Sequence, residues 1–163
     1  MKIFQIILAY VISVIGCNQE SPEMKIKNND FKSAINEYYK YMDSTAYEPG
    51  YYVIVNAEKT NDSLVLSIHY SWGSYNFFQK DVIDYLQYGH HEVLLTGAFP
   101  NRIINAKKKK WPYIENIIKE KYPDEYKKFL NNPSSVGPIM SDDMAMSLVF
   151  KRNRMISCKR QYY

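Results

Sequence analysis

The chain has 163 residues, with 21 basic and 17 acidic side chains and a formal net charge of +4 at pH 7. This length is enough for one domain with a substantial core, and it excludes two domains of ordinary size. The two cysteines exclude a fold held together by a network of disulfides.

The chain opens with an apolar run from Ile3 to Ile15, preceded by the basic residue Lys2. A helix of this length rises about 20 Å, which is short of the roughly 30 Å hydrocarbon core of a bilayer. A basic tip, an apolar stretch of this length and small residues behind it form the pattern of a secretory signal. We therefore expect residues 1–16 to be a cleaved signal peptide, with an uncleaved anchor as an alternative.

The run ends in Val14-Ile15-Gly16-Cys17, which resembles the lipobox of bacterial lipoproteins. The resemblance covers residues 1–17 only, and Val14 replaces the commoner Leu. It implies cleavage between Gly16 and Cys17 and attachment of acyl chains to the Cys17 thiol, which would anchor an exported protein to a bacterial membrane. The residue after Cys17 is not Asp, which favours the outer membrane. An ordinary signal peptide followed by a structural cysteine is the alternative.

Residues 17–29 follow as a polar, Pro-containing stretch, which predicts a lipidated cysteine and a flexible tether ahead of a domain at residues 30–163. With Cys17 lipidated, Cys158 has no partner for an internal disulfide. Cys158 lies in the strand-like sequence "MISCKR", where we expect a small buried hydrophobic residue.

Two patterns in the first half of the domain are clear. The sequence "NNDFKSAINEYYKYMDS" at residues 28–44 repeats apolar residues at spacings of three and four, which predicts a helix capped by Asn29 or Asp30. The sequences "YYVIVNA" and "SLVLSIHYSW", at residues 51–57 and 63–72, are joined by a short polar segment, and the second alternates strictly. They predict an antiparallel hairpin with one face on the core.

The second half is less uniform. Residues 81–88 fit either a helix or one strand of a hairpin, and residues 91–96 favour a strand. Pro112 and Pro123 each stand where a helix can begin. Residues 131–143 are loop-like, and the chain closes with a second hairpin that turns near residues 152–154. This order predicts an α+β domain, a mostly antiparallel sheet with helices packed on one face.

Charge is divided unevenly along the chain. Residues 17–101 have 6 basic and 11 acidic side chains, whereas residues 102–163 have 14 and 6. Such asymmetry is typical of a basic surface for an acidic partner, although two solvated surfaces are the simpler interpretation. The candidate interaction residues are Lys107, Lys108, Lys109, Lys110, Trp111, Arg152 and Arg154. An exported lipoprotein is not expected to bind nucleic acid.

The sequence "YSWGSYNFF" at residues 70–78 is rich in aromatic residues. Its members Tyr70, Trp72, Tyr75 and Phe78 form a candidate site for a glycan or small molecule, with packing in the core as the alternative.

Catalytic and metal sites have little support in the sequence. His90 and His91 are adjacent, so on a strand their side chains point apart and cannot hold one metal without a turn. Asp142 and Asp143, with His69, are the only candidates for hydrolysis, and no known catalytic motif accompanies them. We therefore assign no catalytic residue, metal or cofactor.

The function expected from these patterns is that of a membrane-anchored envelope lipoprotein with a non-catalytic, protein-binding domain, such as an immunity-type inhibitor or an accessory subunit. The alternatives are a lipoprotein that binds a glycan or small molecule and, after that, a hydrolase of cell wall or glycan.

Overall fold

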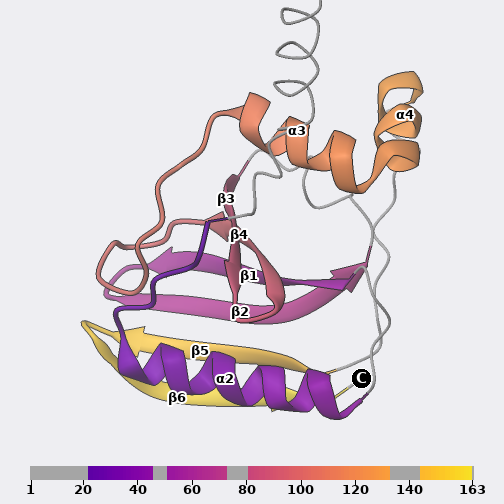
Figure 1. Cartoon of the computed structure of the whole chain (residues 1–163). Coiled ribbons are helices and arrows are strands. Elements are labelled where there is room, and N and C mark those ends of the chain that lie inside the picture. Colours follow the sequence, from indigo (N-terminus) through magenta and orange to yellow (C-terminus); the bar gives the residue numbers. More distant parts are fainter. Residues whose placement is uncertain (1–21, 46–50, 73–80, 133–143, 163) are drawn as a thin grey trace, which may run out of the picture.

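The computed structural model describes residues 22–45, 51–72, 81–132 and 144–162. Its elements in chain order are α2 (Asn29–Ser44), β1 (Tyr51–Thr60), β2 (Ser63–Trp72), β3 (Val82–Tyr88), β4 (His91–Gly97), α3 (Trp111–Lys121), α4 (Pro123–Asn131), β5 (Ala145–Lys151) and β6 (Arg154–Gln161). The strands form one sheet in the order β3-β4-β1-β2-β5-β6, in which only β1 and β4 pair in parallel (Figure 1). The predicted α+β class with a mostly antiparallel sheet is confirmed. Among the described helices, none is long and apolar enough to cross a membrane.

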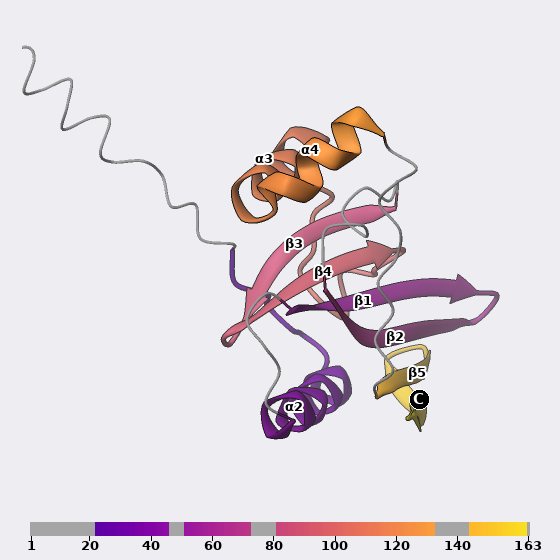
Figure 2. The same cartoon turned by 90° about the vertical axis from the view of Figure 1, so that its right-hand side faces the viewer.

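The helices cover both faces of the sheet rather than the single face that we expected. Figure 2 shows α2 on one side of the sheet and α3 with α4 on the other. Val53 and Val55 of β1 belong to the core under α2, while Tyr52 and Ile54 belong to a second core under α3. A strand that is apolar on both faces needs a cover on each, so the second helical layer is a consequence of β1 itself.

Helix α2 is capped by Asn28, whose Oδ1 accepts a hydrogen bond from the Phe31 backbone N at 3.0 Å. We expected the cap one or two residues later, at Asn29 or Asp30. Asp30 instead accepts a hydrogen bond from the Met155 backbone N at 2.9 Å, which fastens α2 to β6. Six apolar side chains of α2 are buried: Phe31, Ala34, Ile35, Tyr38, Tyr39 and Met42. Five of them belong to the predicted helical stripe, whereas Tyr39 is buried in place of the expected Tyr41, which is half-buried.

The segment that the sequence left open between helix and strand is strand β3. It pairs antiparallel with β4 through a two-residue turn at Gly89 and His90, and Gly89 has a φ of 61°. Tyr85 packs under α3 and Leu86 packs in the core under α2. Burial on both faces explains the ambiguous pattern, because a doubly covered strand does not alternate between polar and apolar residues.

Residues 22–28, predicted to be part of a flexible tether, belong to the folded domain. The Met24 backbone N donates to Gln87 O at 2.6 Å, and Gln87 N donates to Pro22 O at 3.0 Å. Lys27 N donates to Ile103 O at 2.8 Å, and the Met24 side chain is buried. The segment therefore covers the open edge of β3. The chain between Cys17 and Pro22 can then span at most about 18 Å, rather than the roughly 40 Å of the longer tether.

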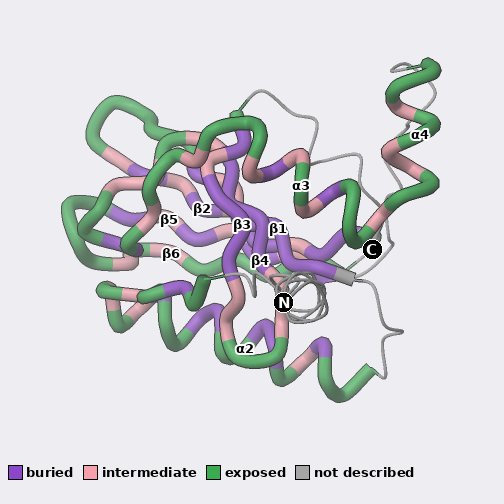
Figure 3. Tube along the Cα trace, turned by 45° about the horizontal axis from the view of Figure 1, so that its top comes forward, coloured by how far each residue is buried: buried purple, intermediate pink, exposed green. Residues whose placement is uncertain are grey.

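Cys158 is exposed, so the prediction of a buried residue is wrong. Strand β6 is the edge of the sheet, and its residues are exposed or half-buried, in contrast to the buried β1 and β4 (Figure 3). An apolar pattern in an edge strand does not guarantee burial, because the strand has a neighbouring strand on one side only.

Gly97, the last residue of β4, lies close to the backbone of β1. Gly97 has a φ of 83°, and a Cβ added there would overlap the Ala57 carbonyl oxygen. Gly89 has a φ of 61°, but a Cβ there meets no atom within 4 Å. We expect Gly97→Ala to lower the free energy of unfolding by about 3 kcal/mol or more, and Gly89→Ala by about 1 kcal/mol. Chemical denaturation of both variants measures this difference, and equal losses would contradict the close approach of β4 to β1.

Candidate functional site

Three connections lie at the end of the sheet where β1 and β4 finish: the β1–β2 turn, the segment that follows β4, and the β5–β6 turn. The turn between β1 and β2 lies beside residues 98–102, with which it lines a surface hollow, and beside the end of β5. Lys151 Nζ lies 2.7 Å from Asp62 Oδ2, which joins this turn to the start of the β5–β6 turn. All three connections lie at the left of Figure 1. We call this region the basic end, defined by Lys59, Arg102, Lys107, Lys108, Lys151, Arg152 and Arg154, all of which are exposed.

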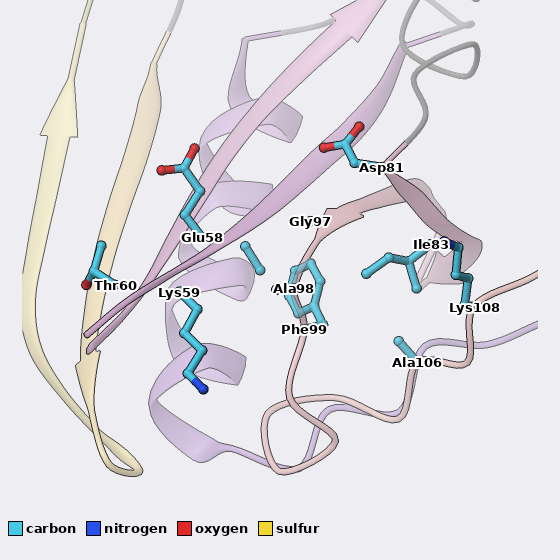
Figure 4. Close-up of a pocket in the computed structure, with 11 residues that line it drawn as sticks. Glu58, Lys59, Thr60, Asp81, Ile83, Gly97, Ala98, Phe99, Ala106 and Lys108 are labelled. Atoms are coloured by element: carbon cyan, nitrogen blue, oxygen red, sulfur yellow. The ribbon is translucent and has the colours of Figure 1, made fainter. Parts of the chain in front are cut away.

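A second hollow of about 750 Å³ opens beside the ends of β1 and β4. Figure 4 shows Phe99 at its centre, with Ile83 directed towards it and Lys59 and Lys108 on either side. Glu58 and Asp81 contribute carboxylates to the rim, which therefore carries both signs of charge. An apolar floor with a charged rim suits a side chain or a small amphipathic group better than a fully apolar ligand.

The four consecutive lysines do not form a freely solvated loop. Lys109 N donates to Ile83 O at 2.7 Å, which attaches the run to the edge of β3. Lys109 is half-buried, with its Nζ 4.8 Å from the centre of the Tyr113 ring. The other three lysines are exposed. Attachment of the backbone thus directs most of the charge to solvent and holds it next to Trp111, which begins α3 and is 42% exposed.

A buried carboxylate that sequence reasoning missed lies beneath this run. Asp84 is 2% exposed, and its Oδ1 accepts a hydrogen bond from Tyr85 N at 2.9 Å. Burial raises its pKa to about 6, although the Lys109 charge and hydrogen bonds from the Tyr85 and Lys107 backbones oppose the rise. Asp84 therefore helps to hold the lysine run against β3. The sequence contains no sign of this role, because it depends on a contact between distant segments.

The structure brings the two predicted basic segments to the same end of the sheet, on either side of the β1–β2 turn. It does not do the same for the candidate aromatic site. Tyr70 is only 4% exposed and belongs to the core under α2, so its ring is not available to a ligand. Only the backbone of Trp72 is described, as the last residue of β2. Tyr75 and Phe78 lie outside the described residues.

Other predicted residues also fall outside the described ranges. These are the expected cleavage and lipidation positions Gly16 and Cys17, and the acidic pair Asp142 and Asp143. His69 lies in β2, and burial lowers its pKa. Nothing in the described residues therefore assembles the suggested hydrolytic group.

A second cluster, at the opposite end of β4, was not predicted. His90 Nε2 and His91 Nε2 lie 3.0 and 2.9 Å from the same atom, Asp43 Oδ1, and their ring centres are 4.1 Å apart. Adjacent histidines converge because His90 is in the turn after Gly89 while His91 begins β4. Gly89 was the available signal for the turn, but Asp43, at the end of α2, has no local sequence signal.

The cluster is electrostatically coupled. Burial alone would raise the pKa of Asp43, but hydrogen bonds and charge from His90 and His91 lower it overall. Burial and the neighbouring His90 lower the pKa of His91, against the opposing effect of Asp43.

Comparison with protein-family models, with curated proteins and with solved structures finds no match for this chain. The site must therefore be interpreted from its own geometry and charge.

The buried carboxylate predicts a pH dependence of stability. Because the pKa of Asp84 is about 6 in the folded chain and 3.8 ordinarily, the folded state holds this proton more tightly than the unfolded state. Its contribution to the free energy of unfolding therefore falls as the pH rises from about 4 to about 6, by on the order of 3 kcal/mol. We expect Asp84→Asn, which keeps an acceptor oxygen without the charge, to raise stability at pH 7 and to remove this fall.

Urea unfolding of the full-length chain between pH 4 and pH 8 measures the effect. Asp81→Asn, at an exposed carboxylate just before β3, is the matched control and should keep the parent profile. An unchanged profile in Asp84→Asn would show that another group causes any pH dependence.

Proposed function

We propose that the chain is a membrane-anchored envelope lipoprotein whose single domain binds an acidic surface of another envelope protein without catalysis, as an immunity-type inhibitor or an accessory subunit. The observation that supports this most is that two separate basic segments lie at the same end of the sheet, on either side of the β1–β2 turn. Basic side chains outnumber acidic ones there, and an uneven field of this kind steers an oppositely charged partner into a productive orientation.

The conformation of Arg152 favours an interaction role for this end. Arg152 has a φ of 55°, and no other described residue apart from glycine has a positive φ. It is the first of the two residues that join β5 to β6, a position where tight hairpins favour Gly. A long charged side chain in this conformation destabilises the turn, and such local strain is typical of functional sites.

The short connection to the expected anchor also supports the proposal. If Cys17 is lipidated, a span of at most about 18 Å to Pro22 keeps the domain next to the headgroup layer. Only a partner that can approach a domain held close to its membrane can then reach this surface. A membrane-bound or membrane-proximal partner fits this restriction.

The alternative, binding of a glycan or small molecule, is favoured by one observation. The hollow beside β1 and β4 has the aromatic ring of Phe99 at its floor and polar groups at its rim. A sugar could stack on this ring and hydrogen-bond to the rim. This position replaces the aromatic set expected from the sequence, because Tyr70 is buried.

Charge reversal at the basic end tests the electrostatic part of the proposal. The full-length chain, purified in detergent and immobilised, is first exposed to solubilised envelope of the source cell to obtain a partner. We expect the double variant Lys107→Glu with Lys108→Glu to lower the association rate of that partner about tenfold at low salt. The difference should shrink at high salt, because screening weakens exposed charges.

The matched control is Lys127→Glu with Lys128→Glu, which reverses two exposed charges on α4, away from the basic end. Its association rate should stay near that of the parent chain. Equal losses in both variants would point to net charge alone, and no loss in either would contradict the proposed binding surface.

Replacing Arg152 separates stability from binding. We expect Arg152→Gly to raise the free energy of unfolding by about 1 kcal/mol, because Gly adopts a positive φ without a steric penalty. The same variant should slow association with the partner. Unfolding in urea and association kinetics measure the two effects, and a variant that binds as fast as the parent chain would remove Arg152 from the binding surface.

A further inference from the structure

The end of α2 and the turn between β3 and β4 bring together three side chains that are common metal ligands. Within the described ranges, Asp43, His90 and His91 are the one group of three or more such residues whose ligand atoms converge, all lying within 4.8 Å of one another. The cluster is at the opposite end of β4 from the basic end, and the function proposed above does not use it.

The distances within the cluster are close to those of a metal centre. Both Nε2 atoms lie 2.9–3.0 Å from Asp43 Oδ1. Tetrahedral Zn²⁺ with bonds of about 2.0–2.2 Å separates its ligand atoms by roughly 3.3 Å. The two nitrogen–carboxylate distances are within a few tenths of an ångström of this value, and the ligand atoms all lie within 4.8 Å of one another. Binding one ion therefore requires small shifts at Asp43 and a movement of the His90 ring by up to about 1.5 Å. The His90 side chain is 74% exposed, so it has the freedom to make this adjustment.

The packing around His91 holds one ligand in place. Its side chain is 14% exposed, and its ring centre lies 4.2 Å from that of Tyr39. Tyr39 itself packs against Tyr88, whose hydroxyl donates to Asn36 Oδ1 at 2.9 Å. The ring of His91 is thus oriented by a layer of aromatic side chains, in the way that supporting residues orient the ligands of metal sites.

The electrostatic environment favours a cation. Asp43 lies in the last turn of α2, and this turn contains no basic residue. The carbonyl groups at the end of a helix carry partial negative charge, which stabilises a nearby cation. The Tyr39 hydroxyl is also buried without a hydrogen-bond partner among the described residues. The Asp43 carboxylate and the end of α2 therefore place negative charge beside the two imidazoles.

We propose that Asp43, His90 and His91 bind one divalent transition metal ion, with Zn²⁺ as the representative ion. Two imidazoles and one carboxylate suit Zn²⁺, Ni²⁺ or Cu²⁺ rather than Mg²⁺ or Ca²⁺, which prefer oxygen ligands. Three protein ligands leave the fourth position of a tetrahedral ion open to water or to a group from a partner. The bound ion joins the end of α2 to the β3–β4 hairpin, so it stabilises the folded chain.

Calorimetric titration with ZnCl₂ tests the proposal. The full-length chain in detergent is used with Cys17→Ser and Cys158→Ser, because thiolates bind Zn²⁺ strongly and would mask the site. We expect one ion per chain with a dissociation constant in the micromolar range. His90→Ala, at an exposed turn position where the fold should tolerate it, should weaken binding about tenfold or more.

The chain contains one further histidine, which provides a matched control. His69→Gln removes an imidazole from β2 and should leave the affinity for ZnCl₂ unchanged. ZnCl₂ should raise the melting temperature of the parent chain and not of His90→Ala, whereas MgCl₂ should raise neither. The proposal is overturned by no binding at millimolar ZnCl₂, by equal affinity of parent and His90→Ala, or by an equal loss in His69→Gln.

Discussion

The parallel pairing of β1 with β4 is the constraint on which the rest of the structure depends. Both strands are apolar on two faces, as the consecutive buried residues Val53–Val55 and Val93–Leu95 show. Burial on both faces requires two covers, and α2 supplies one while α3 supplies the other. An antiparallel sheet with one solvent-exposed face would have needed only α2. The three-layer arrangement therefore follows from the central pair of strands.

Parallel pairing also decides where the candidate sites lie. Because β1 and β4 run in the same direction, their C-terminal ends finish together, and the connections that follow them form the basic end. The start of β4 is at the other end of the sheet, where its turn meets the C-terminus of α2 and brings His90 and His91 to Asp43. Seven residues of strand span about 20 Å, so the two sites are separate surfaces of one rigid element. A change in one should leave the charge and geometry of the other intact.

Several elements could be predicted from the sequence because their signals are local. Helix α2 has its stripe, the β1–β2 hairpin has its alternation, and Pro112 and Pro123 lie in the first turns of α3 and α4. The errors occurred where burial depends on distant segments. Met24 and Ile26 are isolated apolar residues in a polar stretch, and the burial of Met24 requires the edge of β3 to be present. Cys158 follows an apolar pattern, yet it is exposed in an edge strand that has a neighbouring strand on one side only.

The sequence by itself determined the order of most elements, the density of charge at Lys107–Lys110 and the presence of adjacent histidines, because each is a property of neighbouring residues. Only the tertiary structure decided that this lysine run lies at the same end of the sheet as Arg152 and Arg154. It also decided that Asp43, which is 47 positions from His90 in the chain, receives both imidazoles. Periodicity specifies which face of an element is buried, but not which distant element covers that face. The pairing of β1 with β4 resolved this second question.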